Sequence, residues 1–385
     1  MKGVWILLPV IAIALFFPVE PSWSQIILMP GGEFLFYEST RDGISQIYRM
    51  DRVKMRTLNP WPPQTTLRVT ETRVSRRLNY PYRYPATYWK WVTNQGVRRA
   101  EITIAYTSQR GASWNIFTNN DQGDSESTPR ATGVEEKRNL RWSPGGRWIS
   151  YIQKSPQGDR IYRVSASGTV LSNAICATER SIAGHGWLDD NRIIYAKQTE
   201  QSLIPGTTFT TYQFVVRRAD GSAAGTEIYP ISIADVICPV WPCKLIDMKI
   251  SHNRQHVALA WEFKIPVIEV IAEKIEVLSV APGLFLLPVK TVDLDDLAFN
   301  NKTSDIGSIG WSGSDNLLYV AARERQSQNT AEDDRLEIYA YKLNLQDPNL
   351  AVTQENYTNN SAYDSYPDGE INLQLYRVRP GPLNP

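Results

Sequence analysis

Few residues of this chain have the types and spacing that acid–base or nucleophilic chemistry requires. A serine hydrolase would need a Gly-x-Ser-x-Gly turn to hold its nucleophile, and the sequence contains none. No glycine-rich phosphate loop leads into a helix. The histidines stand singly, so we expect each to be a turn or strand-end residue: His185, His252 and His256. We therefore expect no catalytic residues and no cofactor.

Clustered carboxylates are the remaining candidates for chemistry. They occur at Asp189-Asp190, Asp293-Leu-Asp295-Asp296 and Asp333-Asp334. Such groups could cleave a glycoside or hold calcium, but most are expected to be solvated turn residues. No Cys or His spacing is typical of zinc, so we expect no metal site.

One segment is distinctive in charge and in aromatic content. Residues 52–99 contain eleven Lys or Arg and one acid, Glu71, whereas the whole chain has 41 basic and 40 acidic side chains. An anion-seeking surface is one interpretation, in which cations attract an acidic partner and rings supply stacking. The candidate binding residues are Arg76, Arg77, Arg83, Tyr88, Trp89, Lys90 and Trp91. The alternative is that the rings pack within the fold and the arginines form a solvated rim.

The amino terminus has the pattern of a secretory signal peptide over residues 1–24. Lys2 precedes an uncharged, mostly apolar stretch at residues 4–17, and Ser22-Trp-Ser24 puts small residues before a cut at Gln25. That stretch is shorter than the roughly 20 residues of a membrane-spanning helix, although an uncleaved anchor is the alternative. We expect an exported chain, periplasmic or extracellular, with no membrane span after cleavage. Export and the balanced charge argue against nucleic acid as a partner.

Export also favours a disulfide over a metal site for the cysteines. Cys238 and Cys243 flank the rigid spacer Pro-Val-Trp-Pro, whose turn could bring the two sulfurs together. A disulfide between them is the favoured interpretation, which leaves Cys176 as a buried free thiol. Pairing of Cys176 with either of the others stays open.

A repeated sequence pattern, which we call the repeated phrase, predicts the elements that position these residues. A tight turn, a short apolar run, a polar turn and a second apolar couplet recur along the chain. Each run is too short for a helix and reads as a buried strand, and the following couplet makes it a β-hairpin. The apolar runs lie near Phe36, Ala105, Ser150, Ile194, Ala258 and Leu318.

The most regular copy carries a family resemblance. Trp142-Ser-Pro-Gly-Gly-Arg-Trp-Ile-Ser-Tyr151, followed by Arg160-Ile-Tyr-Arg163, is similar to the repeat of TolB-like β-propellers, in which a Trp-Ser-Pro-Asp-Gly turn opens an inner strand. The resemblance implies an all-β propeller with four-stranded antiparallel blades around a channel. We expect one such domain over residues 25–385, with residues 52–99 as a basic, aromatic insertion.

The spacing of the repeats predicts six blades, with seven as the alternative. An open ring would expose a sheet edge, and the alternating segment at residues 366–378 is expected to close it as a strand of the first blade. The polar stretch at residues 354–365 is expected to be the connecting loop.

Three functions fit these observations. The first is a non-catalytic, TolB-like scaffold that binds a protein or an acidic envelope component, with an acidic glycan or anionic lipid surface as possible forms of the latter. The second is a propeller enzyme acting on a glycan. The third is a structural role in a surface assembly.

Overall fold

The computed structural model describes most of the chain between residues 26 and 371. The described ranges are 26–28, 33–57, 64–75, 77, 79–94, 97–168, 174–204, 207–228, 243–265, 270–281, 285–294, 304–313, 315–324, 336–347, 352–358 and 364–371. The expected signal peptide lies outside them. Within these ranges no helix is long and apolar enough to cross a membrane.

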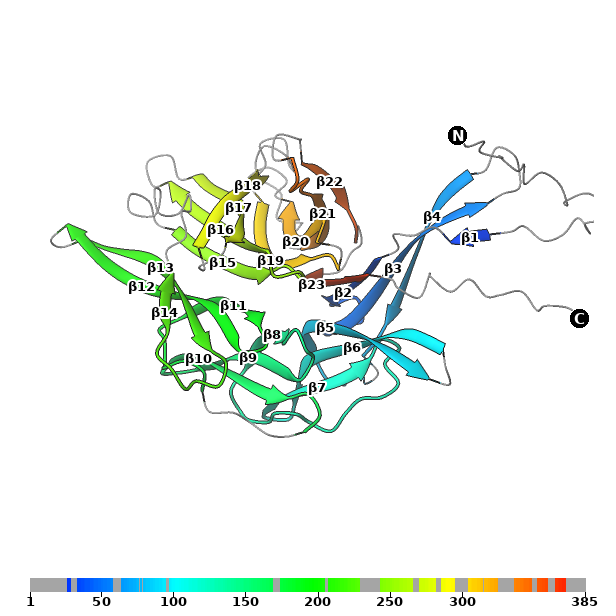
Figure 1. Ribbon diagram of the computed structural model, residues 1–385, viewed down its shortest axis with the longest axis horizontal. Coiled ribbons are helices and arrows are strands. Elements are labelled where there is room, and N and C mark those ends of the chain that lie inside the picture. The colour runs from blue at the N-terminus through cyan, green and yellow to red at the C-terminus, as the bar shows by residue number, and fades with distance from the viewer. Residues whose placement is uncertain are drawn as a thin grey trace, which may run out of the picture.

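The described strands form six antiparallel sheets arranged as the blades of a propeller (Figure 1). Blade 1 contains β1 (Ile26–Leu28), β2 (Glu33–Ser39), β3 (Gln46–Thr57), β4 (Gln64–Arg73) and β23 (Asp364–Ile371). Blade 2 contains β5 (Tyr82–Asn94), β6 (Val97–Arg110) and β7 (Ser113–Asn120), and blade 3 contains β8 (Lys137–Trp142), β9 (Trp148–Ser155) and β10 (Gly158–Ser165). Blade 4 contains β11 (Ile182–Asp189), β12 (Arg192–Ile204), β13 (Thr207–Arg218) and β14 (Thr226–Ile228). Blade 5 contains β15 (Cys243–Ile250), β16 (His256–Ile265), β17 (Val270–Ala281) and β18 (Phe285–Asp293), and blade 6 contains β19 (Ser304–Trp311), β20 (Leu317–Glu324), β21 (Glu337–Lys342) and β22 (Thr353–Asn356).

The ring is closed by the carboxyl-terminal strand. β23 pairs with β2, so blade 1 is built from both ends of the described chain. The innermost strands β23, β5, β8, β11, β15 and β19 each pack against the next around the axis. This arrangement confirms six blades and the expected closure, although two blades have three strands. In those two, isolated bridges at Ala131 and Glu179 stand at the outer edge.

Apolar side chains fill the space between every neighbouring pair of blades. Six separate core clusters are found among the described residues, one for each of the six blade junctions. The junction of blades 6 and 1, for example, buries Leu35 and Tyr37 against Tyr319 and Ile338. Burial of apolar surface on both faces of each sheet explains why the second strands read as continuous apolar runs.

Tryptophans join neighbouring innermost strands by hydrogen bonds. The indole Nε1 of Trp142 donates to the carbonyl oxygen of Ala86 at 2.9 Å, and that of Trp311 donates to the carbonyl of Lys249 at 3.2 Å. Trp187 makes the same contact with the carbonyl of Arg141. Each indole thereby donates to a backbone carbonyl of the preceding blade. The Trp of the repeated phrase is thus a junction residue.

Glycines allow the innermost strands to approach closely at two further junctions. A Cβ on Gly184 would lie 2.7 Å from the Cβ of Met248, and one on Gly310 would lie 2.0 Å from the carbonyl oxygen of Pro367. Only glycine fits such contacts between backbones.

The structure corrects the strand assignment of the repeated phrase. The turn at Ser143-Pro-Gly-Gly146 leads from the innermost strand β8 into β9, the second strand of its blade, and does not open the innermost strand. The apolar runs are therefore second strands. Residues 353–356 form β22 at the edge of blade 6, so the stretch expected to be only a connecting loop contributes a strand.

Candidate functional site

Two pockets open at opposite ends of the innermost strands. The first is lined by residues at the ends of β8, β15 and β19 together with β5, and it has a volume of about 360 Å³. The second is lined by residues at the beginnings of β5, β8, β11 and β15 and has a volume of about 420 Å³. Both volumes lie in the range of small-ligand sites. Between them, charged side chains occupy the axis.

The first pocket combines rings with cations, and we call it the aromatic–cationic pocket. Its lining includes the rings of Tyr88, Trp89, Trp142 and Trp311 and the cations Arg141, Lys249 and Arg254, with Asp368 as the acidic residue of the lining. The ring of Tyr88 stacks on Trp142 at a centroid distance of 5.4 Å. It also covers the turn at Gly146, where a Cβ would lie 2.2 Å from the ring. The ring at this edge of the pocket is therefore held in place.

Arg141 is the least satisfied group of this pocket. Its Nε and Nη2 atoms are buried and make no hydrogen bond. Asp247 and Asp368 are the carboxylates whose charge acts on Arg141, but both accept hydrogen bonds from other groups. Asp247 accepts the backbone N–H groups of Met248 and Ile309, and Asp368 accepts the N–H and hydroxyl of Thr87. Burial lowers the pKa of Arg141, and the two aspartates only partly oppose that effect. Its Nη1 donates to the backbone carbonyl oxygen of Leu140, so two of the three guanidinium nitrogens are left without a partner in the described part of the chain. That arrangement is costly unless an anion approaches.

Lys249 adds a second cation at the same depth. Burial, and then the charge of Arg141, lower the pKa of Lys249 to about 8. The Lys249 side chain makes no hydrogen bond and no ion pair within the described part of the chain. At neutral pH the pocket therefore holds two neighbouring cations, neither of which has a carboxylate partner in the described part of the chain. This combination suits a negatively charged group.

His185 lies on the axis beside these cations, in the middle of β11, and is fully buried. Burial, followed by the charges of Arg141 and Lys249, holds the pKa of His185 well below its usual value, so the imidazole is neutral. Its Nε2 lies 2.8 Å from Oγ of Ser150. The expectation that His185 is a turn or strand-end residue was wrong. It was confirmed for His252, in the turn after β15, and for His256, the first residue of β16.

Some of the predicted binding residues line the aromatic–cationic pocket, and others lie outside it. Tyr88 and Trp89 line the aromatic–cationic pocket, and both come from β5. Lys90 and Trp91 are exposed on the same strand outside the pocket lining, where Lys90 lies 3.7 Å from Glu101. Trp91 packs edge to face on Trp89.

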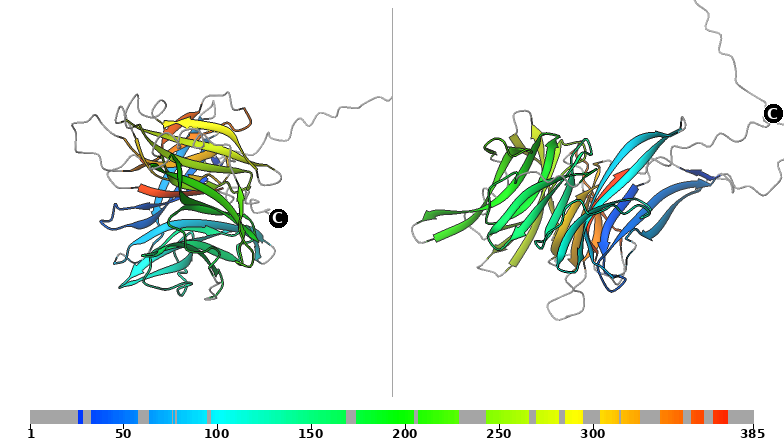
Figure 2. Two further views of the ribbon diagram at one scale, coloured as in Figure 1. Left: turned by 90° about the vertical axis from the view of Figure 1, so that its left-hand side faces the viewer. Right: turned by 90° about the horizontal axis from the view of Figure 1, so that it is seen from below.

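The predicted arginines lie elsewhere and have acidic neighbours. Arg77 is exposed, with its Nε 3.9 Å from Glu126, and Arg83 lies 3.8 Å from the buried Glu38. Arg76 lies outside the described residues. Residues 52–99, expected to be an insertion, contribute the outer half of β3, all of β4 and β5, and the start of β6. The β3–β4 pair extends away from the ring at the right of Figure 1, and the β12–β13 hairpin extends away from it at the left. Both projections are also seen in the right-hand view of Figure 2.

The structure describes two of the three cysteines. Cys243 is disulfide-bonded, and Cys176 is a free, buried thiol, as expected. Cys238, the predicted partner of Cys243, lies outside the described residues. No cluster of three or more His, Cys, Asp or Glu side chains that could hold a metal is found in the ranges that the structure describes.

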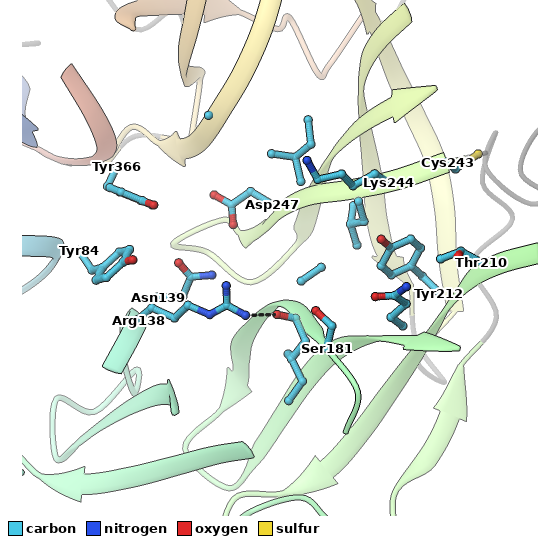
Figure 3. Close-up of a pocket in the computed structure, with 16 residues that line it drawn as sticks. Tyr84, Arg138, Asn139, Ser181, Thr210, Tyr212, Cys243, Lys244, Asp247 and Tyr366 are labelled. Carbon is cyan, nitrogen blue, oxygen red and sulfur yellow. Dashed lines mark hydrogen bonds between the residues drawn. The ribbon is translucent and has the colours of Figure 1, made fainter. Parts of the chain in front are cut away.

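The second pocket, which we call the axial polar pocket, is shown in Figure 3. Asp247 reaches toward its centre from β15, facing Asn139 and the rings of Tyr84 and Tyr366. Arg138 and Ser181 lie along one side, and Lys244 and Tyr212 lie toward the other end. The lining is mainly polar, with three tyrosine rings.

Sequence reasoning missed most residues of both pockets. The innermost strands carry polar or charged residues at the axis, such as Arg141, His185 and Lys249, so they show no apolar pattern. The Trp-Ser turn after β8 was the available signal, because the residue before that Trp is Arg141 on the axis.

Comparison with solved structures finds similar chains at low sequence identity. TolB from Acinetobacter baumannii is similar over 88% of this chain and 66% of its own, with 11% identity and a TM-score of 0.48. A chain of a nidogen/laminin complex matches over 89% and 99%, with 10% identity and a TM-score of 0.45. The β-propeller domain of the trilobed protease from Pyrococcus furiosus matches over 88% and 85%, with 8% identity and a TM-score of 0.43. This chain thus spans slightly less than two thirds of the TolB chain.

No protein-family model and no curated protein sequence matches the chain.

Proposed function

We propose that this chain is an exported, non-catalytic β-propeller scaffold that binds an acidic group of a protein or envelope component in the aromatic–cationic pocket. The observation that carries the proposal is the guanidinium of Arg141 at the wall of a 360 Å³ pocket, where Nη1 donates to the carbonyl oxygen of Leu140 but the buried Nε and Nη2 lack partners among the described residues. A carboxylate there would supply charge-assisted hydrogen bonds, which are about twice as strong as neutral ones. Lys249 would add a second attraction.

Binding fits the pocket better than catalysis does. A glycoside-hydrolysing site of the common type needs two carboxyl groups free to exchange protons or to attack the sugar. Asp247 has both oxygens bonded to backbone N–H groups, and Asp368 is held by Thr87. These acids serve as junction groups between blades. The rings of Tyr88 and Trp89 can stack on the flat or apolar part of a ligand without reacting with it.

A matched pair of ligands tests the proposal. Trigalacturonate and its methyl ester have the same sugar backbone, and only the acid is charged at neutral pH. We expect calorimetric titration to show saturable binding of the acid and much weaker binding of the ester. A glutamate-rich peptide and its glutamine counterpart form a second pair for a protein partner. Equal binding of the charged and neutral members of both pairs would contradict the proposal.

Export is tested separately. Cells that produce the full chain should release it into a fraction outside the cytoplasm, and sequencing of the mature amino terminus should begin at Gln25. A mature protein that retains Lys2 and remains in the cytoplasm would contradict export but leave the pocket untouched.

A further inference from the structure

The axial polar pocket differs from the aromatic–cationic pocket in the state of its charges. Each charged side chain that lines it already has a partner. Arg138 donates to Asp159 at 2.7 Å, Lys244 lies 3.9 Å from Glu262, and the Asp247 carboxylate accepts two backbone N–H groups. An ion entering this pocket would therefore meet side chains whose charge is already opposed by a partner or held by backbone N–H groups.

Four uncharged polar side chains of this pocket, unlike the charged ones, have no hydrogen-bond partner among the described residues. Ser181, Gln198, Thr210 and Asn139 line the pocket and are half-buried, and no side-chain hydrogen bond is found for any of them in the described ranges. The two amides and two hydroxyls together offer donors and acceptors in several directions. They come from two neighbouring blades. Asn139 lies on β8 of blade 3, whereas Gln198 and Thr210 lie on β12 and β13 of blade 4 and Ser181 directly precedes β11 of that blade.

Rings supply the apolar part of the pocket. Tyr84 and Tyr366 meet edge to face with centroids 4.5 Å apart, and both point toward the centre in Figure 3. The Tyr84 hydroxyl is occupied by Glu136 at 2.9 Å, so the ring rather than the hydroxyl is what this residue presents. An aromatic edge beside free amides suits a ligand that has both C–H faces and hydroxyl groups.

The backbone that positions these groups is unusual. Each innermost strand has a register shift relative to the second strand, and in three adjacent blades the shift coincides with a non-glycine residue in the left-handed region. These residues are Tyr84 (φ 55°), Asn139 (φ 52°) and Tyr366 (φ 50°). For bulky tyrosines this conformation is unfavourable, and such residues concentrate at binding sites. All three line this pocket.

We infer that the axial polar pocket binds a neutral saccharide unit, with Asn139 and Gln198 as its principal hydrogen-bonding side chains. The free groups of the pocket are uncharged, its charged groups are engaged, and its rings are held at the edge. The site is independent of the acidic-group site proposed at the other end of the channel.

The test uses the full chain and defined oligosaccharides. Maltohexaose, cellohexaose and chitohexaose serve as neutral probes, and trigalacturonate as the acidic one, with saturation-transfer NMR and calorimetry as readouts. We expect at least one neutral probe to bind. Asn139→Gly keeps the left-handed conformation without strain and removes only the amide, and Gln198→Met preserves the side-chain length. Each should weaken binding about three- to tenfold, the effect of losing one or two hydrogen bonds.

Two controls make the outcome decisive. Gln122→Ala changes an exposed amide outside both pockets and should leave binding unchanged. Arg141→Met should remove binding of the acidic probe without affecting the neutral one, so failure of either proposal is distinguishable from failure of the other. The inference is overturned if no neutral probe binds. It is also overturned if binding survives the Asn139→Gly, Gln198→Met double variant unchanged, or if Arg141→Met abolishes it.

Discussion

The indole Nε1 of Trp187 donates a hydrogen bond of 3.2 Å to the backbone carbonyl oxygen of Arg141, across the junction of blades 4 and 3. The same carbonyl accepts the hydroxyl of Ser150 at 3.3 Å. A fold contact therefore fixes the backbone of the residue whose guanidinium faces the aromatic–cationic pocket. Arg141 thus belongs both to a junction between blades, through its backbone, and to the pocket, through its side chain.

Trp187→Phe should destabilise the protein by about 1–3 kcal/mol, because it leaves a cavity and removes a donor from a buried carbonyl. Urea unfolding at neutral pH measures the change. Trp91→Phe is the matched control, since Trp91 is 39% exposed, and it should alter stability by less than about 0.5 kcal/mol. Equal effects of the two substitutions would contradict the junction role of Trp187.

Binding of an acidic ligand should weaken as the pH rises through about 8. Lys249 carries a pKa of about 8 and loses its charge above it, while Arg141 stays charged and His185 stays neutral. We expect the affinity for trigalacturonate to fall about three- to thirtyfold between pH 7 and 9.5, as measured by calorimetry. The Lys249→Gln variant should bind weakly with a flat profile. A flat profile in the unmodified protein would argue against a role for Lys249.

Removing the same lysine should stabilise the fold. The folded-state pKa is lowered from 10.5, so the unfolded chain binds more protons between pH 8 and 10.5, and the burial cost of the cation applies fully below pH 8. Lys249→Met should therefore raise the free energy of unfolding at pH 7 by about 1–3 kcal/mol. The exposed Lys244→Met serves as the control. Destabilisation by Lys249→Met would show that the lysine is structurally compensated.

The second strands of the blades were predictable from the sequence. A strand that is buried on both faces needs apolar residues at successive positions, and these appear as an uninterrupted apolar run. β9 and β20 illustrate this, with Ile149, Tyr151 and Ile152 in one and Leu318, Tyr319 and Val320 in the other fully or almost fully buried. Closure by β23 was also predictable, since its alternation and its position after the last repeat left blade 1 as the available edge.

The innermost strands and the site were less accessible to sequence reasoning. Strands such as Ile182–Asp189 combine glycines for close approach with polar residues for the channel, so neither periodicity nor apolar content marks them. Tyr88 and Trp89 were found by their aromatic content. Arg141 and Lys249 were not, because the lack of an acidic partner beside each of them among the described residues is a property of three-dimensional placement. The local excess of arginines drew attention to Arg77 and Arg83, which have acidic neighbours.

Glu38 should make stability fall as the pH rises from about 4.5 to 7. Burial raises the pKa of Glu38 to about 7, against the hydrogen bond donated by Ser45 and the charge of Arg83. The folded state then binds more protons than the unfolded state over this interval, so the stabilising contribution is lost as the pH passes 7.

The Glu38→Gln variant tests this titration. It should be more stable than the unmodified protein by about 1–3 kcal/mol at pH 8 and nearly equal at pH 4.5, as measured by urea unfolding at both values. Glu355→Gln, at an exposed carboxylate paired with Arg52, provides the control and should show no such difference. A constant difference for Glu38→Gln across the range would contradict the assignment.

The most direct test of the central claim is a cycle with two ligands and two proteins. The affinities of trigalacturonate and its methyl ester are measured by calorimetry for the unmodified chain and for Arg141→Met, with Arg192→Gln as an exposed-arginine control. We predict that the acid binds at least tenfold more tightly than the ester, as expected for charge-assisted contacts, and that Arg141→Met abolishes this preference while Arg192→Gln retains it. An acid preference that survives Arg141→Met unchanged would contradict the account.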